Sequence, residues 1–192
     1  MTSRDLLYSN ETRNQVRDAY QGVTSTRGLV AERLYTAEEL AQVPAPAAEF
    51  SFGVGNHVDD ARIRPGDMVL DLGCGGGIDA ILAARRTGAA GRVCALDFLS
   101  EMLARTVDSA TEAGLSNVVP LEAEMECIPL SSGAVDRIIS NGAVNLSPRK
   151  ARVFAECGRV LRPGGVFCAS DLTVEEEDLP PEVRTHPAAW AG

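Results

Sequence analysis

The chain has 192 residues, of which 45% are hydrophobic and 23% charged, a composition that indicates a globular protein with one sizeable core. Its formal net charge is −9 and its pI about 4.7, which argues against nucleic acid or an anionic membrane surface as partners and favours a small molecule or another protein. No segment is apolar and long enough to span a bilayer, and the N-terminus lacks the features of a signal peptide, so we expect a cytoplasmic protein.

Residues 1–67 are expected to form a helical lid appended to the core rather than an independent domain. Short helices are expected over 10–20 and 36–43. In the second of these, Thr36 and Glu39 fit a capping box. Residues 44–57 are interrupted by proline and glycine and are expected to form a loop.

Residues 68–192 are expected to form the core, because strand-like and helix-like segments alternate along them. Short apolar runs predict strands over 68–73, 91–98, 118–124, 134–140 and 165–174. Helical spacing of apolar residues predicts one helix after the glycines at 73–77, a second capped by Ser100 and a third entered at Ser147 and Pro148. The alternation predicts an α/β protein, a three-layer sandwich in which helices cover both faces of a mostly parallel sheet.

The five cysteines show no C-x-x-C pair and no spacing typical of a zinc site, so we predict no metal centre. Disulfides are disfavoured in a cytoplasmic chain, and we interpret most of the cysteines as small buried hydrophobic side chains.

The stretch "MVLDLGCGGG" at residues 68–77 predicts a ligand-binding turn. A parallel sheet binds ligands at the carboxyl ends of its strands, where a glycine-rich turn lets a ligand approach the backbone and the next helix offers free N–H groups. NAD, FAD, nucleotide and S-adenosylmethionine sites all use such a turn, so the loop alone does not choose among them.

Three carboxylates favour S-adenosylmethionine. Asp71 at the entrance of the loop would repel a pyrophosphate but can accept hydrogen bonds from an ammonium group, directly or through water. Asp97 ends the second predicted strand and can hold both ribose hydroxyls. Glu124 follows the third strand and can accept a hydrogen bond from the adenine amino group.

The sequence resembles class I S-adenosylmethionine-dependent methyltransferases and, among them, the arsenite methyltransferases. The resemblance is carried by "VLDLGCGGG", "IISNGAVNLSP", "RVLRPGG" and the upstream "YTAEELAQVP" and "SFGVGN". It implies a Rossmann-like methyltransferase fold, S-adenosylmethionine as cofactor with S-adenosylhomocysteine as product, and a small-molecule acceptor. The cofactor-binding residues it implies are Asp71, Gly73, Cys74, Gly75, Gly77, Asp97, Phe98, Met102, Glu124, Met125 and Asn141.

The sequence departs from arsenite methyltransferases at the positions of their arsenic-binding cysteines. This chain has Val54 and Gly142 at two of them. Because a soft metalloid needs soft thiolate ligands, we do not expect arsenite as the acceptor. The last two strands of the fold are also missing, so the fifth strand would be a bare apolar edge. A second copy, a partner chain or a longer natural protein would each cover it.

The sequence offers few groups for the chemistry of methyl transfer. His57 is the candidate general base, and the candidate substrate contacts are Tyr20, Tyr35, His57, Gly142 and Asn145. Two alternatives stay open: a methyltransferase-like subunit that binds S-adenosylmethionine without catalysis, and an enzyme that uses the cofactor for chemistry other than methyl transfer. A NAD-dependent oxidoreductase is a third, more distant alternative.

Overall fold

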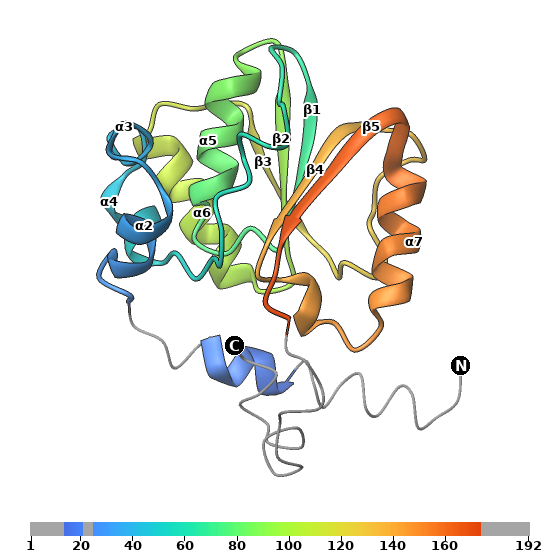
Figure 1. Ribbon diagram of the computed structural model, residues 1–192, viewed down its shortest axis with the longest axis horizontal. Helices are drawn as coiled ribbons and strands as arrows, with labels where there is room; N and C mark the ends of the chain where they lie inside the picture. The colour runs from blue at the N-terminus through green and yellow to red at the C-terminus, as the bar shows by residue number, and fades with distance from the viewer. Residues whose placement is uncertain (1–13, 21–24, 174–192) are drawn as a thin grey trace.

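The computed structural model describes residues 14–20 and 25–173 and shows one five-stranded sheet whose strand pairs are all parallel. The strands are β1 (Met68–Leu72), β2 (Arg92–Asp97), β3 (Val118–Glu122), β4 (Val135–Asn141) and β5 (Leu161–Ser170). Their order across the sheet is β3-β2-β1-β4-β5, so the strand order reverses between β1 and β4 (Figure 1). The predicted α/β class is confirmed, and the reversal marks the crevice where such sheets bind ligands.

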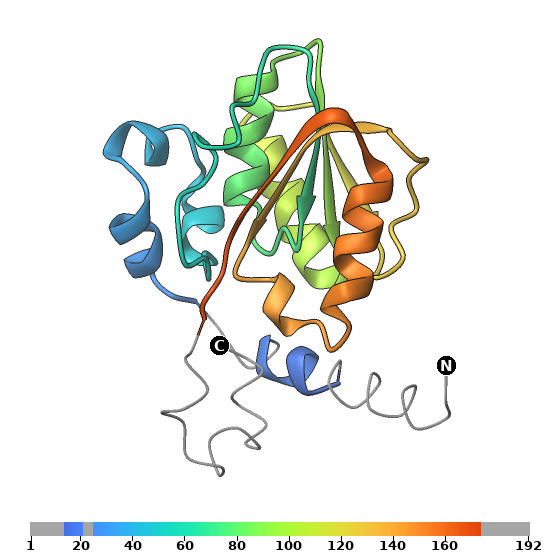
Figure 2. The ribbon, with the colours of Figure 1, turned by 45° about the vertical axis from the view of Figure 1, so that its right-hand side comes forward.

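Helices cover both faces of the sheet. Helices α5 (Ile78–Thr87) and α6 (Ser100–Glu112) pack against β1, β2 and β3, and α7 (Lys150–Val160) packs against β5 on the opposite side (Figures 1 and 2). Strands β1 and β2 are mostly apolar, and β1, β2 and β4 are largely buried, because both faces of a parallel sheet are covered. The fully buried side chains at their centre include Leu70, Leu96 and Ile138.

The N-terminal region forms short helices that lie beside α5 and α6 (Figures 1 and 2). A further helical segment, residues 14–20, lies near the carboxyl ends of the strands. Residues 14–20 are helical, as expected, while 10–13 lie outside the described residues. Helix α3 (Ala37–Leu40) begins at Thr36, and the predicted capping box is present. The role of these residues as a lid stays a prediction.

Two features of the N-terminal region differ from expectation. Residues 44–57 are not loop throughout, because α4 (Ala45–Glu49) begins directly after Pro44. A proline in the first turn of a helix loses no hydrogen bond, so Pro46 starts this helix rather than breaking it. Helix α2 (Leu29–Leu34) was not expected, and it follows Gly28 in the left-handed conformation.

The ends of three core elements also differ from expectation. Strand β5 begins at Leu161, which pairs with Val135 across an irregular register, and it ends at Ser170 rather than at residue 174. Leu99, not Ser100, is the N-cap of α6. Arg149, not Ser147, is the N-cap of α7, which begins at Lys150. The Ser147 hydroxyl does accept a hydrogen bond from the Arg149 N–H.

Three of the five cysteines are buried hydrophobic side chains, as interpreted: Cys74, Cys94 and Cys157. Cys168 is partly buried, and Cys127 is exposed. Within the described residues, no helix is both long and apolar enough to cross a membrane.

The two edges of the sheet differ in how they are protected. The edge strand β3 carries Pro120, which cannot donate to a further strand, and exposed Glu122. The edge strand β5 carries neither a proline nor a charge between Val166 and Ser170. The neighbouring Phe154 of α7 is 51% exposed and packs edge-to-face on Phe167 at 6.0 Å between ring centroids. The β5 edge is therefore apolar and without such protection among the described residues.

We propose that a second copy of this chain covers the β5 edge by strand pairing. We expect the 192-residue protein to elute with twice the 20.3 kDa mass of one chain, measured by size exclusion with light scattering. Ala169→Lys on β5 would place a charge on this edge and return the mass to that of one chain. Val119→Lys on β3 is the matched control and should leave the mass unchanged. A wild-type mass of 20.3 kDa at micromolar concentration would contradict the proposal.

Candidate cofactor and substrate site

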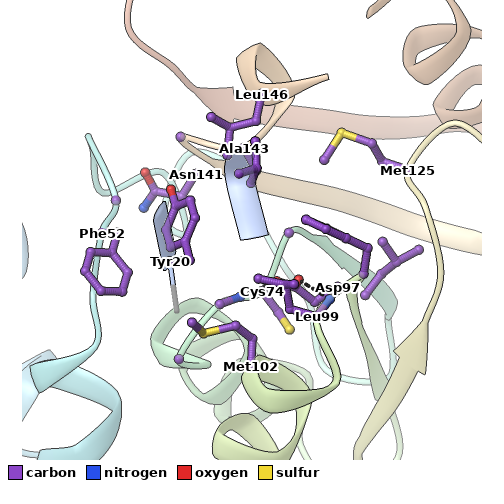
Figure 3. Close-up of a pocket in the computed structure, with 18 of the residues that line it drawn as sticks. Tyr20, Phe52, Cys74, Asp97, Leu99, Met102, Met125, Asn141, Ala143 and Leu146 are labelled. Carbon is purple, nitrogen blue, oxygen red and sulfur yellow. Dashed lines mark hydrogen bonds between the residues drawn. The ribbon is translucent and has the colours of Figure 1, made fainter. Parts of the chain in front are cut away.

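One pocket lies at the carboxyl ends of the strands, beside the point where the strand order reverses (Figure 3). Its walls come from the glycine turn after β1, the ends of β2, β3 and β4, and two N-terminal segments at 16–20 and 50–53. The described lining residues that were predicted as site residues are Tyr20, Gly73, Cys74, Gly75, Asp97, Phe98, Met102, Glu124, Met125, Asn141 and Gly142.

The glycine turn has a shape that only glycine accommodates easily. Gly73, Gly75 and Gly77 have φ values of 81°, 51° and 91°, in the left-handed region. A Cβ on Gly77 would lie 2.9 Å from Oγ1 of Thr106, whose hydroxyl donates to the carbonyl of Gly75 at 2.9 Å. A Cβ on Gly75 would meet nothing within 4 Å, so the backbone there is open to a ligand.

Asp97 stands at the end of β2 and faces this turn. It is 8% exposed, and its two carboxylate oxygens accept hydrogen bonds from the N–H groups of Leu99 and Gly75, each at 3.0 Å. Burial raises the pKa of Asp97, and the backbone hydrogen bonds oppose that rise. A carboxylate can accept about four hydrogen bonds, so Asp97 keeps capacity for a ligand hydroxyl beside these backbone donors.

The side chain of Asn141, at the end of β4, ties the N-terminal segment to the pocket. Its oxygen accepts from the N–H groups of Val54 and Gly55 at 2.8 and 3.2 Å. Its Nδ2 donates to the carbonyl of Gly55 at 2.8 Å and to Oδ2 of Asp79 at 3.0 Å. Tyr35 completes the network, because its hydroxyl donates to Oδ1 of Asp79 at 2.8 Å.

Three buried carboxylates gather beneath the glycine turn: Asp71, Asp79 and Asp97. Burial is the main cause that raises the pKa of each, and the charges of Asp79 and Asp97 raise the pKa of Asp71 further. Oδ2 of Asp71 has no hydrogen-bond partner. A cationic ligand at this end of the pocket would relieve the mutual repulsion.

Five predicted site residues do not line the pocket: Tyr35, His57, Asp71, Gly77 and Asn145. Asp71, Gly77 and Tyr35 support its walls, through the carboxylate cluster, the helix cap of α5 and the bond to Asp79. Asn145 instead holds the chain after β5, with its side chain donating to the carbonyl of Leu172.

His57 is buried away from the pocket. It is 2% exposed, and neither ring nitrogen has a hydrogen-bond partner. Burial lowers the pKa of His57, against the charges of Asp79 and Asp60. The structure therefore does not place His57, the candidate general base, among the residues that line this pocket.

Sequence reasoning missed several lining residues, notably Val16, Phe50, Phe52, Asp79 and Glu126. Asp79 had a usable signal, since it is an acidic residue in the first turn of a helix that follows a glycine loop. Phe50 and Phe52 had none, because they lie in a segment that pattern alone assigns to a loop. Among the described residues, no cluster of three metal-ligating side chains is placed to hold a metal ion.

The fold and the pocket define a class of protein. A parallel sheet with this strand order, a glycine turn after β1 and a carboxylate at the end of β2 are typical of Rossmann-like domains that bind a nucleoside-containing ligand. A family model described as a methyltransferase domain matches residues 63–192. The chain belongs to this methyltransferase family.

Known relatives agree with this assignment. An arsenite methyltransferase of Halobacterium salinarum is 34% identical, over 95% of this chain and 52% of its own length. An arsenic(III) S-adenosylmethionine methyltransferase structure from Chlamydomonas reinhardtii is 33% identical, with a TM-score of 0.66 over 91% of this chain and 54% of that one. An Aquifex aeolicus SAM-dependent methyltransferase structure is 28% identical, with a TM-score of 0.58 over 65% of this chain and 66% of that one. The chain thus spans about half the length of the Halobacterium salinarum arsenite methyltransferase.

Replacing Asn141 tests the network that it forms. Asn141→Leu would remove the acceptor of the Val54 and Gly55 N–H groups and the donor to Oδ2 of Asp79, at about 1–3 kcal/mol for each buried group left unpaired. We expect a lower free energy of unfolding in urea and faster hydrogen exchange at the Val54 and Gly55 amides. Gln42→Leu, at an exposed amide, is the control and should change stability by less than about 0.5 kcal/mol. Unchanged amide protection in Asn141→Leu would contradict this role.

Burial of His57 predicts a pH dependence of stability. Because the pKa of His57 is lower in the folded chain than its ordinary value of 6.5, the unfolded chain binds the proton first as the pH falls. The contribution of the neutral His57 ring to the free energy of unfolding is therefore fully present above pH 6.5. It is lost as the pH falls towards the pKa of His57 in the folded chain. We expect the free energy of unfolding of the wild type to decrease, relative to His57→Leu, between about pH 7 and 5. Parallel pH profiles for the two proteins would contradict this expectation.

Proposed function

We propose that this chain binds S-adenosylmethionine and transfers its methyl group to a small molecule other than arsenite. One observation carries the proposal: Asp97 lies at the end of β2 with its carboxylate against an open glycine turn, in a chain of the methyltransferase family. The names of the similar proteins add the cofactor, since both solved structures described above are of S-adenosylmethionine-dependent methyltransferases.

The pocket residues fit the parts of this cofactor. Asp97 would accept hydrogen bonds from the ribose hydroxyls, because its backbone donors leave part of the carboxylate's accepting capacity free. Glu124 and Met125, which line the pocket just after β3, would contact the adenine. The buried carboxylates Asp71 and Asp79 favour a ligand with positive charge, and the cofactor carries a sulfonium and an ammonium group but no phosphate.

Bound S-adenosylmethionine supplies an activated methyl group for an in-line displacement. The residues of this chain contribute by holding donor and acceptor at short distance and in line, which by itself accounts for a large part of catalysis in such reactions. Side chains from residues 16–20 and 50–53 line one side of the pocket, where they would limit the access of water to a bound cofactor. His57 has no part in this proposal because it does not line the pocket.

Val54 and Gly142 occupy two positions at which the resemblance to arsenite methyltransferases implies arsenic-binding cysteines. A Cβ on Gly142 would be 3.6 Å from Cγ1 of Val54, so the two positions are neighbours in space. Cysteines at both would form a thiol pair, but valine and glycine supply no soft ligand. Cys74 is the one cysteine among the described lining residues, and burial raises its pKa well above the ordinary value, which disfavours the thiolate.

The cofactor assignment is tested by Asp97→Asn, which keeps the shape of the side chain but replaces its charge with an amide that cannot accept from four donors. We expect the Kd for S-adenosylmethionine, measured by calorimetry, to rise at least tenfold, which is about 1.4 kcal/mol. Asp108→Asn, on the exposed face of α6, is the matched control and should leave the Kd unchanged. Equal affinity of wild type and Asp97→Asn would contradict the ribose assignment.

A turnover assay distinguishes the proposed methyltransferase from a subunit that binds S-adenosylmethionine without catalysis. Formation of S-adenosylhomocysteine with a small organic acceptor, and none that depends on arsenite with a thiol reductant, is the expected result. Binding of S-adenosylmethionine without product across a broad acceptor panel would instead favour a cofactor-binding subunit. No binding of S-adenosylmethionine by the wild type would contradict the proposal altogether.

A further inference from the structure

The pocket has two sides of different character. The side assigned to the nucleoside is built from Asp97, Leu99 and Met125 at the ends of β2 and β3, and the opposite side carries Tyr20 and Phe52 (Figure 3). Because the first side is taken by the cofactor under the proposed function, the second side is where an acceptor would lie.

This second side is an aromatic wall made of Tyr20, Phe50 and Phe52. The rings of Tyr20 and Phe52 meet edge-to-face with centroids 5.5 Å apart at 84°, and those of Phe50 and Phe52 with centroids 6.5 Å apart at 70°. The Arg105 guanidinium lies 3.7 Å from the Phe50 ring centroid and fixes that ring by a cation–π contact. All three side chains are only partly buried, so ring surface remains for a ligand.

The charged side chains that line the pocket are all acidic, and the Arg105 guanidinium, which lies on the Phe50 ring, is not among the lining residues. Four acidic residues line the pocket, namely Asp79, Asp97, Glu124 and Glu126, and no Lys, Arg or His lines it within residues 14–20 and 25–173. After burial, the charges of Asp97 and Asp171 raise the pKa of Tyr20, which shows that negative charge reaches the wall. Nearby Lys150 and Arg152 donate to the main-chain carbonyls of Ser147 and Glu126 and are not part of the lining.

We propose that the methyl acceptor is an uncharged or cationic small molecule with an aromatic ring, which packs on the wall formed by Tyr20, Phe50 and Phe52. The inference rests on the proposed function and narrows its substrate class. Ring edges and faces are available for offset or edge-to-face packing, which aromatic pairs prefer. An acceptor with a carboxylate or phosphate would meet acidic side chains in a pocket whose described lining holds no cation to balance its charge, because the Arg105 guanidinium lies on the Phe50 ring outside that lining.

The transfer itself balances without a further reactant. A cationic amine first gives a proton to water, which leaves a lone pair on its nitrogen. The lone pair on this nitrogen, or on an oxygen substituent, forms the bond to the methyl carbon as the carbon–sulfur bond breaks. The sulfur keeps the electron pair of that bond and becomes a neutral thioether. The proton of the acceptor atom leaves to water.

A matched set of three ligands tests the proposed chemical class of the methyl acceptor. Benzylamine, benzyl alcohol and benzoate share one ring and differ in charge, and each would be titrated into the full chain saturated with S-adenosylhomocysteine. We expect benzylamine and benzyl alcohol to bind at least tenfold more tightly than benzoate. Phe52→Leu, which keeps an apolar side chain but removes the ring, should weaken binding of both at least threefold while the Kd for S-adenosylhomocysteine stays within twofold of the wild type. Phe154→Leu, outside the pocket, should change neither constant.

The outcomes separate this inference from the proposed function. Benzoate binding as tightly as benzyl alcohol, no binding of any of the three, or equal affinities in Phe52→Leu and wild type would each overturn the acceptor class while leaving cofactor binding in place. Failure of the wild type to bind S-adenosylhomocysteine would overturn the proposed function, and the acceptor class with it.

Discussion

The pocket depends on one amide side chain at the end of β4. Asn141 accepts from the backbone of Val54 and Gly55 and donates to Asp79, so it fastens the N-terminal segment to the carboxyl edge of the sheet. An amide suits this position because it can donate and accept at once, whereas a carboxylate would repel Asp79. The segment that carries the aromatic wall therefore owes its placement to a residue 87 positions away from Val54 in the chain.

Electrostatics and backbone shape act together at the glycine turn. Left-handed glycines bring the backbone of residues 73–77 close to the ligand space, and the Gly75 N–H reaches the Asp97 carboxylate. The same turn lies over buried Asp71 and Asp79, whose pKa values are raised by burial. A phosphate-bearing ligand would face these carboxylates, while a sulfonium or ammonium would be attracted to them. The proposed chemistry of the donor and the proposed limits on the acceptor both rest on this distribution of charge.

Local pattern predicted the regular parts of the fold well. The five strands, their parallel arrangement and the helices α5, α6 and α7 follow from apolar runs and helical spacing that packing on both faces of a sheet reinforces. Sequence pattern predicted the boundaries of helices and strands less well where those boundaries depend on tertiary contacts. Helix α4 begins directly after Pro44 in a segment that pattern assigns to a loop, and β5 begins at Leu161, before the predicted start at residue 165, because Leu161 pairs with Val135 on the neighbouring strand. Helix caps also moved by one or two residues, since Leu99 and Arg149 precede α6 and α7.

The sequence by itself determined the glycine turn, the carboxylate at the end of β2 and the absence of thiols at positions 54 and 142, because each depends on residue identity at a place that the strand pattern already locates. Tertiary structure alone decided which residues face the pocket. It buried His57 and Tyr35 away from the pocket lining, turned Asn145 towards the end of β5, and brought Phe50 and Phe52 beside Tyr20. Side-chain direction in irregular segments depends on contacts between residues far apart in the chain, and no local spacing encodes those contacts.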